Sequence, residues 1–217
     1  MGTYQEMIPL KGIYFIGIAG GSASGKTTVA SKLSEFLGTD KSSIINLDCY
    51  YNDLSGIPAE AREKKNFDHP DSIDLNLLSS HLNQLSTGMP ISLPHYDFVT
   101  HTRKAETEVF IPKEYVILEG LFTLAIKKIR SLLKYKIYVN ASDDVRLIRR
   151  IMRDTNERNR NIDSIINQYL NSVKKMHNTI IEPSKKYADS IINWDNYDLT
   201  PIKTISKNIK YAKKRIK

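Results

Sequence analysis

The sequence predicts an α/β fold in which a five-stranded parallel sheet lies between two layers of helices. Three observations lead to this prediction. Short apolar segments recur along the chain, segments with helical spacing of apolar residues fill most gaps between them, and a glycine-rich loop follows the first apolar segment. Strands that alternate with helices form parallel sheets covered on both faces. The 217 residues are enough for a single domain, 1–217, with a small insertion.

The strands are predicted from short apolar runs, which are typical of strands buried on both faces of a sheet. Their expected ranges are 13–19, 43–47, 115–119, 136–139 and 189–193. The helices are predicted from apolar residues that recur every three or four positions. Their expected ranges are 26–37, 73–86, 143–158 and 164–181. Two further strand-like runs lie within about 90–112, so we expect a small β-hairpin insertion there.

A basic amphipathic helix is predicted at the C-terminus, at about 201–216. Thr200 is placed to cap it, and Pro201 suits its first turn. We expect its apolar face to dock on the domain and its lysines to occupy the other face. Binding of RNA or a membrane through the lysines is the alternative. The apolar face consists of Ile202, Ile205, Ile209, Ala212 and Ile216.

Composition argues against several classes of protein. A single cysteine, Cys49, allows no internal disulfide and is typical of a reducing compartment, where we expect it to pack as a small side chain. No apolar run is long enough to cross a membrane, and the first residues lack the pattern of a signal peptide, so we expect a cytoplasmic protein without a membrane partner. The net charge of +8 could indicate a nucleic-acid partner, but seven positive charges lie in 203–217 alone, which disfavours one.

The glycine-rich loop, GGSASGKT at 20–27, has the spacing G-x-x-x-x-G-K-[ST]. In such loops the backbone N–H groups turn toward a polyphosphate, the lysine reaches the outer phosphates and the next hydroxyl ligates Mg²⁺. The following helix offers its N-terminus, where anions are favoured. The sequence therefore predicts a site for a nucleoside triphosphate and Mg²⁺. The residues expected to hold the triphosphate are Gly20, Gly21, Ser22, Ala23, Ser24, Gly25, Lys26, Thr27 and Thr28.

Two carboxylates lie at the ends of predicted strands. Asp48 follows the second strand and Glu119 ends the third. The carboxyl ends of parallel strands open on one crevice, so we expect both near the terminal phosphate. We predict that Asp48 orients and deprotonates an acceptor hydroxyl, and that Glu119 holds Mg²⁺ together with Thr27. The alternatives are a capping role for Asp48 and a structural role for Glu119.

Longer segments resemble the uridine/cytidine kinase family. Residues 66–74, NFDHPDSID, are similar to its N-[FY]-D-H-P-x-x-x-D signature, and LPHYDFVTHTR at 93–103 is similar to its next conspicuous segment. The resemblance continues through RRIMRDTNERNR at 149–160 and covers about 12–192 in order. This set of motifs is far more specific than the phosphate-binding loop, which many families share.

The resemblance implies a P-loop kinase fold and transfer of the γ-phosphate of ATP or GTP to the 5′-hydroxyl of uridine or cytidine. It implies that Asp48 is the general base and that Lys26 stabilises charge on the transferring phosphoryl group. Arg153 and Arg158 would contact the donor phosphates from a lid at about 153–162. A homotetramer is implied by the resemblance alone.

The resemblance also implies how the nucleoside is held. Asp68, with Arg150 alongside, would accept hydrogen bonds from the ribose hydroxyls. Tyr51 and Phe67 would pack around the nucleoside. The residues implied to contact the pyrimidine are Tyr96, His101, Arg160 and Gln168.

Two positions depart from the family pattern. After Asp189 the family continues into Pro-Arg-Gly-Gly, whereas this chain reads SIINWDNYD, which leaves the choice of ATP or GTP open. Trp194 in this segment is expected either to stack near the donor base or to pack in the interior. Asn159 replaces a glycine of the lid, and because asparagine tolerates left-handed backbone, we expect the turn to survive.

Two other functions were weighed against this one. Another small-molecule kinase, resembling phosphoribulokinase or pantothenate kinase, is disfavoured by the segments at 66–74 and 96–101. A regulatory protein that binds nucleotide and RNA through the basic tail is the alternative from a different class. The presence of Lys26 and of both carboxylates favours an active enzyme.

Overall fold

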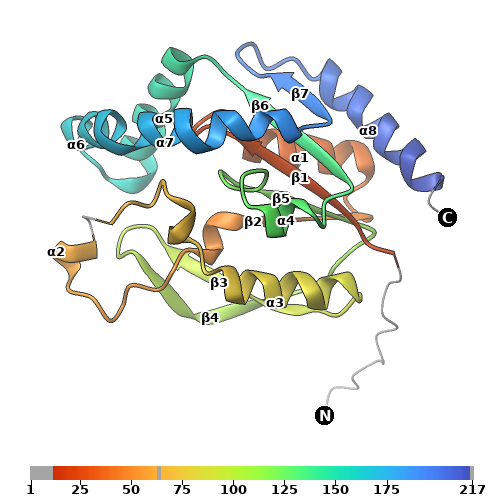
Figure 1. Cartoon of the computed structure of the whole chain (residues 1–217), viewed down its shortest axis with the longest axis horizontal. Coiled ribbons are helices and arrows are strands. Elements are labelled where there is room, and N and C mark those ends of the chain that lie inside the picture. The colour runs from red at the N-terminus through yellow and green to blue at the C-terminus, as the bar shows by residue number, and fades with distance from the viewer. Residues whose placement is uncertain (1–11, 63–64, 216–217) are drawn as a thin grey trace.

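A central sheet of five parallel strands in the order β2-β5-β1-β6-β7 organises the fold (Figure 1). The structure is a computed structural model that describes residues 12–62 and 65–215. The predicted strands are confirmed, each within one residue at either end. Their bounds are Tyr14–Gly20 for β1, Ser42–Asn46 for β2, Tyr115–Glu119 for β5, Tyr135–Asn140 for β6 and Ser190–Asn193 for β7.

Helices fill most gaps between the strands. The helices predicted at 26–37 and 143–158 have these bounds, and the one predicted at 73–86 begins at Leu75, where the Asp74 carboxylate caps it. The helix predicted at 164–181 is interrupted by two wide π-type turns, which a 3.6-residue apolar period does not reveal. The bounds are Lys26–Leu37 for α1, Ala59–Arg62 for α2, Leu75–Ser86 for α3, Lys127–Arg130 for α4, Asp143–Arg158 for α5, Ile162–Gln168 for α6, Lys174–Met176 for α7 and Thr200–Lys214 for α8.

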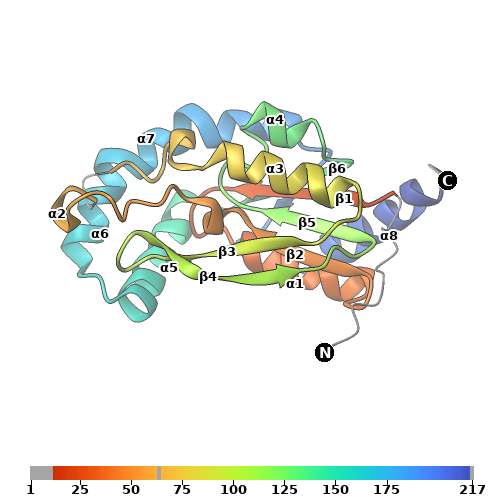
Figure 2. The same cartoon turned by 90° about the horizontal axis from the view of Figure 1, so that it is seen from below.

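Alternate residues of β1 point to opposite faces of the sheet and reach two separate cores. Tyr14, Ile16 and Ile18 join the core that α1 and α8 cover. Phe15 and Ala19 join the core that α3 and α4 cover. Figure 2 shows these helices on opposite sides of the sheet. The three-layer α/β architecture is therefore confirmed.

The insertion predicted at about 90–112 is an antiparallel hairpin outside the main sheet. Its strands are β3, Ile91–Asp97, and β4, Thr102–Phe110. His101 lies in the turn between them with a left-handed backbone, at φ 55°. The hairpin thus carries two of the four predicted pyrimidine-binding residues, Tyr96 near the end of β3 and His101 in the turn.

The C-terminal helix α8 differs in two respects from its prediction. Thr200 is its first residue and caps nothing; instead Asp198 accepts a hydrogen bond from the Thr200 N–H. Lys213 is buried, donates to the Glu114 carbonyl and pairs with the Glu114 carboxylate, so the lysines are not confined to the outer face. The apolar stripe packs as predicted through Ile202, Ile205 and Ile209, while the predicted Ile216 lies outside the described residues. None of the helices in 12–62 and 65–215 combines the length and apolar character needed to cross a membrane.

Candidate active site

The phosphate-binding loop lies between β1 and α1 and is shaped by left-handed backbone. Gly25, directly before α1, has φ 95°, and Ala23 has φ 59°. The Ser24 N–H donates to the Gly21 carbonyl at 3.1 Å, and Lys26 Nζ donates to the same carbonyl at 2.9 Å. Lys26 therefore folds back over the loop, where it can follow the outer phosphates of a bound chain.

Thr27 and Glu119 come together behind the loop. The Thr27 hydroxyl donates to Glu119 Oε1 at 2.9 Å, and Glu119 is buried at the end of β5. Burial raises the pKa of Glu119, while the Lys26 charge opposes that shift. Burial also lowers the pKa of Lys26, and the Glu119 and Asp48 carboxylates oppose it. The charged groups of Lys26, Glu119 and Asp48 therefore act on one another and form one electrostatic unit.

The donor set in this unit suits a hard cation. Thr27 and Glu119 offer a hydroxyl and a carboxylate oxygen, which Mg²⁺ prefers. Within the described ranges, no group of three or more His, Cys, Asp or Glu side chains is arranged to hold a metal ion by itself. In phosphoryl-transfer sites Mg²⁺ takes one or two protein carboxylates and completes its shell with water and phosphate oxygens.

Asp48 lies on a short 3₁₀ turn, Leu47–Tyr50, that follows β2. The cap of this turn is Asn46, whose side-chain oxygen accepts from the Asp48 N–H at 2.8 Å. The capping alternative for Asp48 is therefore wrong. Its neighbour Cys49 is partly buried against the core, and burial raises the pKa of its thiol to about 12, consistent with a packing role.

A pocket of about 880 Å³ extends from the loop toward the hairpin and α6. It brings together most of the predicted site residues. Gly20, Gly21, Ser24, Gly25, Thr27, Thr28 and Glu119 do not line it and lie in or behind the phosphate-binding loop. The predicted residues that line it are Ser22, Ala23, Lys26, Asp48, Tyr51, Phe67, Asp68, Tyr96, His101, Arg150, Arg153, Arg158, Arg160 and Gln168.

Aromatic rings form one wall of the pocket. Tyr51 contacts Phe67 edge-on at 5.7 Å and Tyr96 at 5.4 Å between ring centroids. Phe67 stacks on His101 at 4.4 Å and 18° between planes. The Tyr96 hydroxyl is buried and has no hydrogen-bond partner among the described residues, and burial raises its pKa to about 12. This wall offers flat apolar contact and one buried hydroxyl donor to a planar ring.

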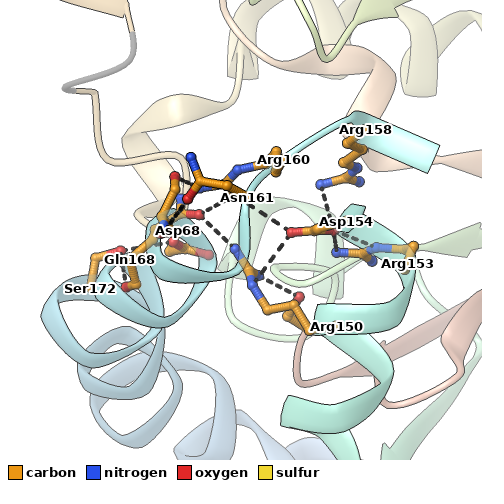
Figure 3. A network of polar contacts seen from close by, with 11 residues as sticks. Asp68, Arg150, Arg153, Asp154, Arg158, Arg160, Asn161, Gln168 and Ser172 are labelled. Atoms are coloured by element: carbon orange, nitrogen blue, oxygen red, sulfur yellow. Dashed lines mark hydrogen bonds and ion pairs between the residues drawn. The ribbon is translucent and has the colours of Figure 1, made fainter. Parts of the chain in front are cut away.

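A polar network forms the opposite wall (Figure 3). Ser172 donates to Asp68 Oδ2 at 3.0 Å, and Asp68 is 7% exposed. Burial raises the pKa of Asp68, opposed chiefly by the Arg150 charge. Gln168 Oε1 accepts hydrogen bonds from Arg150 at 2.8 Å and from Arg160 at 2.6 Å. The predicted nucleoside residues are thus linked to one another before any ligand arrives.

The arginines of α5 contact different parts of the molecule. Arg150 also donates to Ser22 of the loop at 2.8 Å, and Arg153 donates to Asp154 at 2.9 Å. Arg158 lies 4.7 Å over the Phe98 ring. Arg149 points away from the pocket and donates to the carbonyls of Trp194 and Asp195.

Both departures from the family pattern have a structural explanation. Trp194 is 1% exposed, and a Cβ added at Gly25 would lie 2.3 Å from its indole ring, so it packs against the loop. The structure therefore favours the packing interpretation. Asn159 has φ 50° and ψ 38°, the left-handed conformation expected of a residue that replaces glycine there.

Sequence reasoning missed several residues of the pocket. Phe98 and Ser172 gave no signal of their own, although Phe98 lies within a quoted motif and Ser172 follows Gln168 by one helical turn. Asp154, which lies behind the pocket lining, was missed as well. Asp154 is enclosed by arginines and belongs to the same network.

Comparisons with known proteins point to one family. Residues 15–200 match the family described as Phosphoribulokinase / Uridine kinase family. A uridine kinase from Lactobacillus helveticus is 51% identical over 82% of this chain and 84% of its own. A uridine kinase from Clostridium perfringens is 48% identical over 90% of this chain and 94% of its own. The solved phosphoribulokinase from Rhodobacter spheroides shares the fold, with a TM-score of 0.62 and 15% identity over 83% of this chain and 69% of that one.

Proposed function

The chain belongs to the phosphoribulokinase / uridine kinase family, and from this premise we infer that it phosphorylates uridine and cytidine with a nucleoside triphosphate. We propose ATP or GTP as the donor and the 5′-hydroxyl as the acceptor, so that the products are UMP and CMP. One observation supports this most strongly. A single pocket connects Lys26 of the phosphate-binding loop with the buried Asp68 and with the aromatic wall at Tyr96.

Phosphoryl transfer follows from the residues at the loop end of this pocket. Asp48 takes the proton of the 5′-hydroxyl. The hydroxyl oxygen then bonds to the γ-phosphorus, while the bond between the γ-phosphorus and the β,γ-bridging oxygen breaks. Lys26 balances the charge on the transferring group and on the departing diphosphate. Mg²⁺, held by Thr27 and Glu119, would neutralise phosphate charge when bound.

The other end of the pocket accounts for the acceptor. Ribose presents vicinal hydroxyl donors, and an ionised Asp68 accepts such bonds while Ser172 and Arg150 hold it in place. The buried Tyr96 hydroxyl can bond a pyrimidine that packs against Phe67 and Tyr51. Uracil has an acceptor and cytosine a donor at position 4, and a histidine such as His101 can serve either through its two ring nitrogens.

The wider proposal concerns organisation. We propose that residues 1–217 act as one kinase domain, that 153–162 form a lid whose Arg153 and Arg158 contact the donor phosphates, and that the enzyme is a cytoplasmic homotetramer. The proposal of a lid is based on the position of both arginines in the pocket lining. Light scattering of the purified protein tests the assembly.

The test of function is nucleoside-dependent release of ADP or GDP with Mg²⁺. Uridine, cytidine, thymidine and adenosine are each paired with ATP and with GTP. Turnover restricted to uridine and cytidine supports the proposal and identifies the donor. Triphosphate binding without turnover of either pyrimidine riboside contradicts it and favours a different acceptor.

A further inference from the structure

Asp154 is a fully buried carboxylate, 0% exposed, near the end of α5, and the reaction as derived above does not use it. Four arginines surround it, and its two oxygens face different partners (Figure 3). Oδ1 lies 2.8 Å from Arg153 Nη2 and 3.6 Å from Arg158 Nη1. Oδ2 lies 3.6 Å from Arg150 Nε and 3.5 Å from Arg160 Nη1.

The arginines on Oδ1 belong to the phosphate half of the pocket. Arg153 lies near enough to Lys26 for its charge to lower the pKa of that lysine. Burial lowers the pKa of Arg158, and the Asp48 carboxylate lies near enough to oppose that shift. Both arginines line the pocket at this end.

The arginines on Oδ2 belong to the acceptor half. Arg150 and Arg160 both donate to Gln168, and the charge of each acts on Asp68. One carboxylate therefore contacts two pairs of guanidinium groups, and Arg150, which also donates to Ser22 of the phosphate-binding loop, links the two halves of the pocket.

The charge of this cluster is unbalanced. Four guanidinium groups face three carboxylates among the described residues, Asp154, Asp68 and Asp48, so one positive charge is left over. Burial together with the neighbouring Arg153 lowers the pKa of Arg158, which shows that the arginines repel one another. Such an excess suits an anion, and the buried carboxylate limits the repulsion until the anion arrives.

We propose that Asp154 is a positioning residue that orients the arginines of both substrate sites from a single buried carboxylate. It touches neither substrate and acts through Arg153 and Arg158 on the triphosphate and through Arg150 and Arg160 on the nucleoside. This inference rests on the proposed function for the identity of the acceptor. Its effect on the triphosphate does not depend on that identity.

The test is Asp154→Asn, which keeps size and removes charge, compared with Asp144→Asn on the exposed first turn of the same helix. Steady-state kinetics should show KM for uridine and KM for the triphosphate both raised about tenfold, the order expected for loss of one charge-assisted hydrogen bond. Asp144→Asn should leave both unchanged. A merely structural defect would lower the apparent kcat with the folded fraction and move neither KM.

Asp154→Glu restores the charge one methylene further out and should bring both KM values back toward those of the unaltered enzyme. If Asp154→Asn folds poorly, Asp154→Ser, which is smaller and also neutral, is the test variant, with the same rise expected in both KM values. Both KM values within about twofold of the unaltered enzyme in the folded neutral variant would overturn the inference. Calorimetric titration with the Mg²⁺ complex of a non-hydrolysable ATP analogue, without nucleoside, separates the two proposals. If the unaltered enzyme binds it but phosphorylates neither uridine nor cytidine, the proposed function fails, and the affinity of the variants still decides the role of Asp154.

Discussion

Replacing Asp68 by asparagine should weaken recognition of ribose while leaving the fold intact. The side chain is 7% exposed, and its Oδ2 already accepts from Ser172, a bond that an amide oxygen can keep. What asparagine removes is the charge that strengthens a bond from a substrate hydroxyl. Hydrogen bonds to charged groups contribute about 1.5–3 kcal/mol, which corresponds to about 10- to 100-fold in kcat/KM at 1.36 kcal/mol per tenfold.

The assay compares kcat/KM for uridine and 2′-deoxyuridine in the unaltered enzyme and in Asp68→Asn. The variant should lose most of its activity on uridine and much less on the deoxy analogue, so that discrimination between the two shrinks. Asp71→Asn is the matched control, because that carboxylate lies three residues away and is 89% exposed. Equal losses on both nucleosides would refute the assignment of Asp68 to the ribose hydroxyls.

The pH dependence provides a second check on the same residue. Burial raises the pKa of Asp68 above its ordinary value. The ionised form that accepts the hydroxyls is therefore lost on the acid side at a higher pH than for an exposed aspartate. Because the folded pKa is raised, the stability that the neutral carboxyl contributes is lost as the pH rises from the unfolded pKa through the folded pKa. At neutral pH the ionised Asp68 therefore destabilises the folded protein, and Asp68→Asn should unfold at no lower temperature there. A large fall in Tm would show that the side chain is mainly structural.

Two further predictions concern the phosphate-binding loop. Gly25→Ala should destabilise the protein by about 2 kcal/mol or more in urea unfolding, because φ is 95° and the new Cβ would meet Trp194 at 2.3 Å. Gly56→Ala is the control, since no atom lies within 4 Å of the added Cβ. Equal stability of the two variants would contradict the loop geometry. Trp194, the single tryptophan of the chain, packs on this loop, so binding of a triphosphate should change its fluorescence. Calorimetry gives the concentration at which the triphosphate saturates the protein. Unchanged emission at that concentration would argue against a loop that adjusts to its ligand.

Local patterns predicted most of the scaffold because each pattern is set by burial. The inner strands β1 and β5 are apolar runs buried along their whole length, and Val29 and Leu33 mark the inner face of α1. The turns within 164–181 were missed because a π-type turn changes the hydrogen-bond partner without breaking the apolar sequence. The cap predicted at Thr200 was wrong because the helix begins at that residue, Leu199 takes the N-cap position without a side-chain bond, and Asp198 accepts from the Thr200 N–H.

The site was predictable where a motif prescribes the chemistry. Lys26, Thr27 and the strand-end carboxylates follow from spacing and topology alone, whereas Asp68 and Tyr96 depended on the family resemblance. The burial of Lys213 and Asp154 could not be predicted, because a charged residue on a helix is normally expected to face solvent. Lys213 is buried by Glu114, which is distant in sequence, and Asp154 by arginines on neighbouring turns. Such placements depend on the assembled tertiary structure.

The most direct test of phosphoryl transfer through Asp48 compares uridine turnover by the unaltered enzyme and by Asp48→Asn, with triphosphate affinity measured by calorimetry in both. We predict that the unaltered enzyme converts uridine to UMP, and that the variant binds the triphosphate equally well but turns over at least about 100-fold more slowly, as expected for loss of a general base. Turnover by the variant within a few-fold of the unaltered enzyme would contradict the mechanism.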